Sequence, residues 1–499
     1  MKLKFGTGGL RAVMGDGVGC MNKSVIQKAT LGVAAYAKKG INNPCIAIAY
    51  DTRKHSECFA KETARIFASE GCLVYIYPMA MPTPLLSFAV RELKCHLGVC
   101  ITASHNPKEY NGYKVYGSDG CQITSTAAKA IQNEIDKSDE NNIRECRSFE
   151  DFVRERVILY ISDQIKEAYL EEILKYRTCR DNINNIRIVY TPLHGTGLLP
   201  MLEMFEAIGA LKIALVKEQM NQDGDFPTCP CPNPEEDEAL KLGLELCQKK
   251  NADILLATDP DSDRIGVAAK KGHKFERLSG NQLGILILDY LLSCRKNANS
   301  LPEKPVILKT IVTTSMAEKI AAEYGAEVID TLTGFKYIGE QLSRLETNGT
   351  IERFVFGMEE SCGYLIGPYV RDKDAIGTAM IVCEMADKYK KQGKTLWDRL
   401  YELYERHGYY YSTLETKMYE ESEAKIAMEH LREQLKLEKA RYDEKNVVRY
   451  EDYLDGLHGL PKANVVKIWL EDGNVVVIRP SGTEPKIKIY TEKHKMALT

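Results

Sequence analysis

Three aspartates occupy alternate positions in the segment DPDSDR, residues 259–264. If this loop is extended, Asp259, Asp261 and Asp263 point to one side and their carboxylates converge. Crowded carboxylates repel one another unless a cation balances them, and hard divalent cations prefer oxygen ligands. The pattern therefore predicts a metal site. Arg264 stands beside it, which suits a phosphate that contacts both the metal ion and this arginine. The alternative is an acidic loop exposed to solvent. An EF-hand is excluded, because Arg264 stands where that loop needs glycine.

A second segment, TASHNP at residues 102–107, places Ser104 beside His105. Pro107 prevents helical continuation, so the segment is expected to be a loop. The functional interpretation is a nucleophilic or phosphoryl-carrying serine. The alternative is an Asn-Pro turn in which the serine only bonds the backbone. A hydrolase nucleophile elbow is excluded, because no G-x-S-x-G surrounds this serine.

Two further segments offer groups that recognise sugars and phosphates. In GMEES, Glu359 and Ser361 can accept and donate hydrogen bonds to vicinal hydroxyls, although adjacent glutamates are also common on surfaces. In RPSGTEPK, hydroxyls, a glycine amide and basic side chains predict a phosphate cradle, the alternative being an ordinary turn. The cradle residues are Arg479, Ser481, Gly482, Thr483 and Lys486.

Together the four segments suggest a sugar that carries phosphate at one end and meets the serine and the metal at the other. Transfer, hydrolysis and isomerisation all remain open from the residues alone. ATP and NAD are not expected. Lys388 replaces the first glycine of a P-loop, and Arg11 replaces the last glycine of a GxGxxG fingerprint.

The elements that must position these loops recur three times. Each set has three short apolar runs rich in Val and Ile, with a helical pattern between the first two, which is typical of βαβ units. The runs are 45–50, 73–78 and 97–102; 186–191, 212–217 and 252–258; and 305–312, 326–332 and 353–358, with helices expected at Cys58–Ser69, Leu199–Ile208 and Met316–Tyr324. The third run of each set leads into TASHNP, DPDSDR or GMEES. Ligands bind beyond the carboxyl ends of parallel strands, so three site loops are predicted.

The last hundred residues break this rhythm. A helical pattern at Ala424–Leu435 precedes a hairpin that turns at Asp472 and Gly473. The predicted fold class is α/β with four domains, three of similar mixed α/β sheet topology and a smaller α+β C-terminal domain. The expected boundaries are 1–155, 156–275, 276–405 and 406–499. The region 136–185 has a charged, helical pattern and no site signal.

Composition excludes several classes of protein. The chain has 499 residues, 67 Lys plus Arg against 70 Asp plus Glu, and no basic stripe, so nucleic-acid binding is not expected. The longest apolar stretch, Leu283–Leu292, is half the length of about twenty residues that a membrane span needs. No signal peptide is recognisable, and 15 scattered cysteines without a CxxC pair suit reduced thiols. A cytoplasmic location is expected.

Nine ordered segments across almost the whole chain resemble the α-D-phosphohexomutases, in the phosphoglucomutase/phosphomannomutase branch with a GEES-type sugar loop. This resemblance implies four domains around a central cleft, with the fourth closing over it. The segments are FGTGGLR (5–11), TASHNP (102–107), NGYK (111–114), TPLHGTG (191–197), DPDSDR (259–264), TGFK (333–336), GMEES (357–361), RDKD (371–374) and RPSGTEP (479–485).

The resemblance also implies an activity and its cofactor. Glucose 1-phosphate and glucose 6-phosphate would interconvert through phosphoserine at Ser104, with glucose 1,6-bisphosphate as intermediate and activator. Mg²⁺ would lie between the phosphoserine and Asp259, Asp261 and Asp263. The other implied catalytic residues are His105, Lys114 and Lys373. The implied substrate contacts are Arg11, Asp263, Arg264, Thr333, Lys336, Glu359, Ser361, Arg479, Ser481, Gly482 and Thr483.

Rival interpretations remain at this point. The same scaffold could act on mannose 1-phosphate or on a pentose 1-phosphate. A non-catalytic sugar-phosphate sensor would be marked by loss of the serine or of an aspartate, and all four are present. A Ser/Mg²⁺ phosphatase would have no use for the phosphate cradle. The expected partners are small phosphosugars, with no nucleic acid and no membrane, and the sequence predicts no particular oligomeric state.

Overall fold

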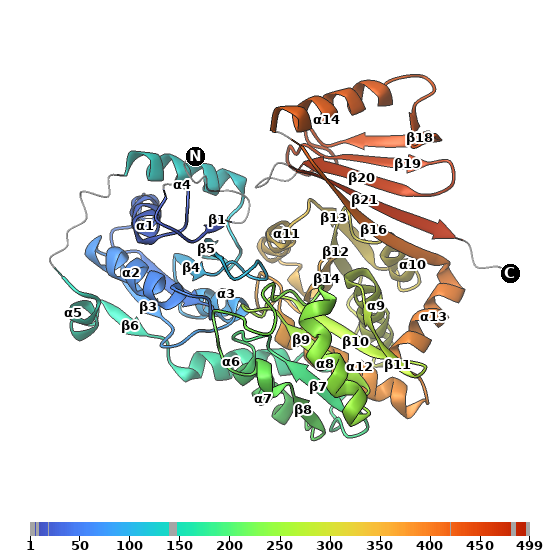
Figure 1. Ribbon diagram of the computed structural model, residues 1–499, viewed down its shortest axis with the longest axis horizontal. Coiled ribbons are helices and arrows are strands. Elements are labelled where there is room, and N and C mark those ends of the chain that lie inside the picture. Colours follow the sequence, from blue (N-terminus) through green and yellow to red (C-terminus); the bar gives the residue numbers. More distant parts are fainter. Residues whose placement is uncertain are drawn as a thin grey trace.

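The computed structural model describes residues 5, 9–17, 19–138, 147–419, 421–480 and 486–495. These residues form four β-sheets, one in each of four domains that follow one another along the chain (Figure 1). Helices cover the first three sheets, whereas the C-terminal domain, drawn in red, is a sheet with one long helix beside it (Figure 1). No helix in the described part of the chain combines the length and the apolar character that a bilayer crossing requires.

The first domain contains a six-stranded sheet in the order β1-β5-β4-β2-β3-β6. Helices α1, α2 and α4 cover one face and α3 covers the other, because apolar residues line both sides of the central strands. The elements are β1 (Leu10–Val13), α1 (Lys23–Ala37), β2 (Cys45–Tyr50), α2 (Ser56–Ser69), β3 (Leu73–Ile76), α3 (Thr83–Glu92), β4 (Leu97–Ile101), β5 (Tyr110–Gly117), α4 (Ser125–Lys137), α5 (Phe149–Arg154) and β6 (Ile158–Tyr160).

The second domain contains a five-stranded sheet in the order β11-β10-β9-β7-β8. Its elements are α6 (Asp163–Leu174), β7 (Ile188–Thr191), α7 (Leu198–Ala207), β8 (Ile213–Leu215), the 3₁₀ turn η2 (Lys217–Gln219), α8 (Asp237–Lys250), β9 (Ile254–Thr258), β10 (Ile265–Lys271) and β11 (Lys274–Leu278).

The third domain contains a four-stranded sheet in the order β13-β12-β14-β15. Its elements are α9 (Gly280–Asn297), β12 (Val306–Thr310), α10 (Met316–Ala322), β13 (Glu327–Thr331), α11 (Phe335–Thr347), the 3₁₀ turn η3 (Ile351–Arg353), β14 (Phe354–Glu359), β15 (Gly363–Leu365), α12 (Ala375–Lys391) and α13 (Leu396–His407).

The three sheets repeat one arrangement. In each, the strand from the first apolar run lies between the strands from the second and third runs, and all three are parallel. An antiparallel strand then follows the third: β5 after β4, β10 after β9 and β15 after β14. The nine expected strands and three expected helices are confirmed, with bounds that differ by a few residues. In each domain, the loop between the third strand and the antiparallel strand that follows it contains residues of TASHNP, DPDSDR or GMEES.

The C-terminal domain contains a six-stranded antiparallel sheet in the order β16-β21-β20-β19-β18-β17. The expected helix and hairpin are both present, as α14 and as the pair β19 and β20. The elements are β16 (Tyr409–Met418), α14 (Glu421–Leu435), β17 (Arg441–Tyr442), β18 (Lys445–Asp452), β19 (Val466–Leu470), β20 (Val475–Pro480) and β21 (Lys486–Lys495).

One expectation differs for the segment after α4. Within the predicted helical region the structure has α5 and α6 but also the strand β6, which pairs in parallel with β3. The first sheet therefore extends past the boundary expected at residue 155. This strand has only three residues, too few to give a recognisable periodicity in the sequence. Its extended conformation is fixed by its pairing with β3. Residues 139–146 of this region lie outside the described part.

The apolar cores show how the domains are joined. One continuous cluster includes residues of the first three domains, such as Leu86, Phe205 and Met380. The C-terminal domain has its own core between α14 and its sheet. It touches the third domain through a small cluster that includes Ile311, Leu332 and Tyr490. The shared apolar core thus holds the first three domains firmly together, whereas only a small apolar cluster attaches the fourth domain to the third.

Candidate active site

The serine loop and the aspartate loop meet between the first and second domains. Ser104 follows β4, Asp259 follows β9, and Ser104 Oγ donates a hydrogen bond of 2.7 Å to Asp259 Oδ2. Ser104 is buried and its backbone has a φ of 53°, in the left-handed region that non-glycine residues rarely adopt. The sequence predicted both loops, and the packing of the two domains brings them into contact.

The aspartate loop is a tight turn, whereas an extended loop was expected. Asp259 Oδ1 accepts hydrogen bonds from the backbone amides of Asp263 and Arg264, at 3.1 and 3.0 Å. Ser262 takes a left-handed φ of 52°, and its amide donates to the Asp259 carbonyl. The carboxylate therefore curls the chain around itself as an Asx turn does. The three carboxylates converge because the chain bends, and not because side chains alternate along it.

The convergent carboxylates fit a divalent cation. One oxygen from each of Asp259, Asp261 and Asp263 lies within 4.8 Å of the other two. Asp261 Oδ1 and Asp263 Oδ1 are buried and have no hydrogen-bond partner among the described residues. Burial, reinforced by the other two aspartates, raises the pKa of Asp259 well above its ordinary value. A cation would remove this repulsion and satisfy both orphaned oxygens.

Two lysines approach the aspartates from different domains. Lys114 Nζ, on β5, lies 2.8 Å from Asp261 Oδ2 and 3.5 Å from Asp263 Oδ2. Lys373 Nζ, just before α12, lies 3.2 Å from Asp263 Oδ2 and 3.1 Å from Asp372 Oδ1. Burial alone would lower the pKa of each lysine, but the adjacent carboxylates outweigh it and raise both. Both ammonium groups are therefore charged and border the serine centre.

One histidine and two arginines lie near the serine. His105 Nδ1 lies 3.3 Å from Ser104 Oγ, and burial, with Arg264 and Arg11 nearby, lowers the pKa of this imidazole well below its ordinary value. Arg11, on β1, donates to Asn106 Oδ1 at 2.8 Å. Arg264 pairs with Glu235 Oε2 at 3.3 Å, and its Nε has no hydrogen-bond partner among the described residues. The two guanidinium groups can bind a phosphate at this centre.

A cavity of about 1730 Å³ extends from this centre to the C-terminal domain. The predicted residues that line it are Arg11, Ser104, His105, Lys114, Asp263, Arg264, Thr333, Lys336, Glu359, Ser361, Lys373 and Arg479. Asp259 and Asp261 lie beneath its surface, fully buried. A cavity lined by four domains, with a candidate metal site and distant cations, suits a polar ligand with charge at two ends.

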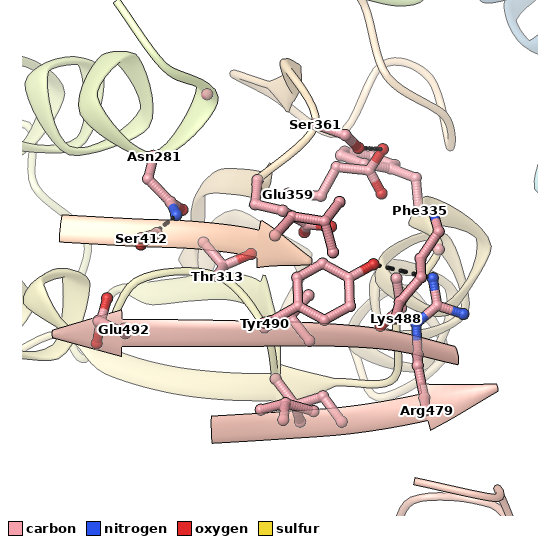
Figure 2. A pocket seen from close by; sticks show the side chains of 18 of the residues that line it. Asn281, Thr313, Phe335, Glu359, Ser361, Ser412, Arg479, Lys488, Tyr490 and Glu492 are labelled. Carbon is pink, nitrogen blue, oxygen red and sulfur yellow. Dashed lines mark hydrogen bonds between the residues drawn. The ribbon is translucent and has the colours of Figure 1, made fainter. Parts of the chain in front are cut away.

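The cavity wall that carries the predicted sugar-recognition residues comes from the third domain. Ser361 Oγ donates to Glu359 Oε1 at 3.0 Å, and Figure 2 shows the two side chains turned toward each other above the sheet of the C-terminal domain. Glu359 closes strand β14, whereas the whole motif was expected in a loop. Thr333 Oγ1 and Lys336 Nζ are buried without a partner in the described part of the chain. Four hydrogen-bonding groups are thus available to hydroxyls or a phosphate.

The opposite wall comes from the C-terminal domain. Arg479, on β20, donates from Nη2 to the Tyr490 hydroxyl at 3.1 Å, and Figure 2 shows its guanidinium close to this ring. Its Nε is buried and has no partner among the described residues. Lys486 lines the same wall. Ser481, Gly482 and Thr483 lie outside the described residues, so the predicted cradle is represented by its two flanking cations.

Sequence reasoning missed residues that support the loops. Thr83, at the start of α3, donates from its hydroxyl to Asp261 Oδ2 at 2.9 Å and from its amide to the Asp261 carbonyl. Arg53 contacts the backbone of the serine loop. Glu235 pairs with Arg264. Arg53 was findable, because it follows the first strand of its set at the same sheet edge as the serine loop; Thr83 and Glu235 carried no comparable signal.

Comparison with known proteins identifies the family to which this four-domain architecture belongs. Four segments match the domains described as phosphoglucomutase/phosphomannomutase alpha/beta/alpha domains I, II and III and the C-terminal domain, at residues 2–142, 167–272, 279–407 and 423–498. The chain therefore belongs to the phosphoglucomutase/phosphomannomutase family, and its activity is that of a phosphosugar mutase, an isomerase. The resemblance drawn from the nine segments is confirmed.

Individual relatives agree over almost the full length. A phosphoglucomutase of Staphylococcus epidermidis is 34% identical over 509 residues, which cover 98% of this chain and 90% of the relative. The open form of pp63/parafusin from Paramecium has a TM-score of 0.74 at 18% identity, covering 100% and 92% of the two chains. An N-acetylphosphoglucosamine mutase of Aspergillus fumigatus, solved with GlcNAc-6P and magnesium, has a TM-score of 0.54 at 13% identity, covering 100% and 93%.

Proposed function

We propose that this phosphosugar mutase interconverts glucose 1-phosphate and glucose 6-phosphate, with Ser104 as the phosphoryl carrier and glucose 1,6-bisphosphate as the intermediate. The observation that carries the proposal is the contact of 2.7 Å between Ser104 Oγ and Asp259 in a cavity that also contains Arg479. The first feature suits phosphoryl transfer, and the second suits a phosphate that is bound and not transferred. The S. epidermidis relative is named a phosphoglucomutase, which supports glucose as the sugar.

The chain's own residues account for the transfer. Arg11 and Arg264 bind the phosphoryl oxygens beside Ser104, while Arg479 binds the phosphate at the far end of the sugar. When the phosphoryl group leaves Ser104 Oγ, that oxygen needs a proton and the sugar hydroxyl must lose one. Lys114 and Lys373 line the same cavity as Ser104 and are both charged, so either can give a proton to an oxygen there, and the neutral amine that remains can then take up the proton of the other oxygen.

The bisphosphate must then present its opposite phosphate to Ser104. The sugar turns end over end, so the groups that read its hydroxyls meet them in two orientations. The Glu359 carboxylate can accept hydrogen bonds and the Ser361 hydroxyl can both donate and accept them, which suits this requirement. We expect tolerance toward hexoses that differ at one hydroxyl as a consequence.

Mg²⁺ is proposed at Asp259, Asp261 and Asp263, with Ser104 as the fourth protein ligand. The orphaned oxygens of Asp261 and Asp263 and the raised pKa of Asp259 support it. When bound, the ion supplies positive charge that neutralises the phosphoryl oxygens. The magnesium in the A. fumigatus structure supports this choice of metal. The predicted cytoplasmic location also belongs to this proposal.

Intact mass spectrometry with peptide mapping tests the carrier. Purified protein incubated with glucose 1,6-bisphosphate and Mg²⁺ should gain about 80 Da, one phosphoryl group, on the peptide that contains Ser104. The same preparation should convert glucose 1-phosphate to glucose 6-phosphate in a coupled assay. Mannose 1-phosphate and a pentose 1-phosphate, assayed in parallel, would reveal a different preferred sugar.

Ser104→Ala is the matched control. It should fold normally, gain no mass and lose activity, because the nucleophilic oxygen is gone. Loading at another residue, or full activity of this variant, would contradict the assignment of Ser104. Net release of phosphate without interconversion would instead indicate a phosphatase.

A further inference from the structure

We infer that Arg53 is a positioning residue that sets the backbone of the serine loop so that Ser104 meets the aspartate loop. The inference rests on the proposed role of Ser104 as phosphoryl carrier. Arg53 does not line the cavity formed by the described residues, so it acts on the reaction through the loop and not on the sugar.

The guanidinium of Arg53 binds four carbonyl oxygens of one loop. Nη2 donates to the carbonyl of Ser104 at 2.5 Å and to that of Asn106. Nη1 donates to the carbonyls of Pro107 and Tyr110, at 2.8 and 3.1 Å. The side chain is fully buried. One planar group thus gathers the carbonyls of residues 104–110 on a single side.

This loop needs such a device because its backbone is unfavourable. The left-handed φ of 53° at Ser104 costs free energy in a residue with a side chain, and it persists only where surrounding contacts enforce it. The Ser104 amide also donates to Thr102 Oγ1 at 2.8 Å. The peptide groups on both sides of the serine are therefore fixed, one through an amide and one through a carbonyl.

Asp51 joins these two contacts. Its Oδ2 accepts a hydrogen bond of 2.6 Å from Thr102 Oγ1 and lies 3.3 Å from Nε of Arg53. Its Oδ1 accepts from the Arg53 amide and from Ser56 Oγ, at 3.0 and 2.7 Å. The buried carboxylate neutralises the buried guanidinium and orients the threonine. Both arms of the network therefore end at Ser104.

The second domain closes over the network. The Phe226 ring centroid lies 5.2 Å from the Arg53 guanidinium carbon. Gly224 approaches so closely that a Cβ there would lie 2.4 Å from the Lys54 amide nitrogen. His194, in the TPLHGTG segment, contacts the Asn221 carbonyl at 3.0 Å and Thr228 Oγ1 at 2.9 Å, which anchors this covering loop. The domain that supplies Asp259 thus also confines Arg53.

Lysine cannot replace this arginine in kind. A guanidinium offers five N–H donors in a rigid plane, whereas an ammonium offers three on a compact group that cannot reach four dispersed carbonyls. We expect Arg53→Lys to preserve charge but release part of the loop. A displacement of about 1 Å at a reacting atom lowers rates by about 100-fold, so loading of Ser104 should slow by about 10- to 100-fold.

The experiment measures the rate at which glucose 1,6-bisphosphate phosphorylates Ser104, by intact mass, in wild type, Arg53→Lys and Lys54→Met. Lys54 is the adjacent cation, half-exposed and paired with Asp225. Arg53→Lys should show the slow loading, a matching fall in kcat and a KM for glucose 1-phosphate within about twofold of wild type, because the cavity walls are unchanged. Lys54→Met should load as wild type does.

A second pair of variants covers the case in which Arg53→Lys fails to fold, as judged by circular dichroism. Thr102→Val keeps the shape of the side chain but removes the hydroxyl oxygen that accepts a hydrogen bond from the Ser104 amide, whereas Thr102→Ser retains this hydroxyl. Slow loading of Ser104 in the valine variant and loading close to wild type in the serine variant support the network. Wild-type loading in folded Arg53→Lys, or equal loading in both threonine variants, overturns it. A wild type that does not load at all contradicts the proposed function instead.

Discussion

Lys336 lies on the cavity wall formed by the third domain, and its charge depends on its surroundings. It is 4% exposed, and burial lowers its pKa to about 8. The folded free enzyme therefore loses this positive charge as the pH rises through about 8, whereas an exposed lysine would keep it to about pH 10. Below that pH the ammonium can attract an anionic substrate.

We predict that kcat/KM for glucose 1-phosphate falls between about pH 7 and pH 9 in wild type. Lys336→Arg should lower activity at neutral pH but remove this limb, because guanidinium stays charged throughout. The measurement is a pH profile of both proteins. Identical profiles would show that this lysine does not contribute its charge.

Arg479 offers a second test at the scale of single residues. Its Nε is a buried donor without a partner in the described part of the chain, as expected of a group that awaits an anion. Arg479→Ala removes a charge-assisted contact of about 1.5–3 kcal/mol, so KM should rise by about 10- to 100-fold.

Steady-state kinetics measures this change. Arg441→Ala is the control, since Arg441 is an exposed arginine of the same domain that does not line the cavity. An unchanged KM, with no release of bisphosphate, would show that Arg479, at the end of β20, does not bind a phosphate of the substrate.

At the scale of elements, one aspartate starts a helix and braces the active site. Asp374 caps α12 by accepting from the amides of Ile376 and Gly377, at 2.9 and 3.2 Å. The hydroxyls of Tyr169 and Tyr369 also donate to it, at 2.7 and 2.6 Å. The residue is fully buried, and it directly follows Lys373, so the helix start fixes where that lysine lies.

We predict that Asp374→Ala lowers the free energy of unfolding by about 3 kcal/mol, because it leaves several buried donors without an acceptor. Urea denaturation measures the loss. Tyr169→Phe, which deletes one of the four donors, should cost only about 1 kcal/mol. Equal effects of the two substitutions would argue against the cap as the main contribution.

At the scale of the whole molecule, polar contacts attach the C-terminal domain to the third domain. The Glu492 carboxylate, on β21, accepts from the Ser315 amide at 3.1 and 3.2 Å and from the Ser315 hydroxyl. Asn281 donates to Ser412 at 3.0 Å, a contact that Figure 2 also shows. The apolar contact between these domains is small, so these hydrogen bonds contribute much of the interaction that holds the C-terminal domain over the cavity.

We predict that Glu492→Gln lets the bisphosphate escape more often, because it weakens this closure while leaving the serine centre intact. The concentration of glucose 1,6-bisphosphate that gives half-maximal activity should rise by about tenfold. Glu471→Gln is the control, since among the described residues the Glu471 carboxylate accepts hydrogen bonds only from Asn446 of its own domain. An unchanged bisphosphate requirement would show that this contact does not restrain the domain.

The sequence alone predicted the strands, the helices between them and the loops that follow the third strand of each set. Nine apolar runs predicted nine strands, and the third run of each set correctly led to Ser104, Asp259 or Glu359. These features follow from short-range causes: buried strands are apolar on both faces, and proline or glycine ends them. Family resemblance added the expected roles of Lys114 and Lys373, which lie on elements with no distinctive local pattern.

Only the tertiary structure decided what these residues touch. Ser104 and Asp259 are 155 positions apart, and their contact depends on the packing of two domains. The pairing of β6 with β3 and the clamp of Arg53 on four carbonyls likewise arise from contacts between distant segments. Such contacts leave no periodicity in the sequence, because burial and hydrogen bonding constrain the chain only after it has folded.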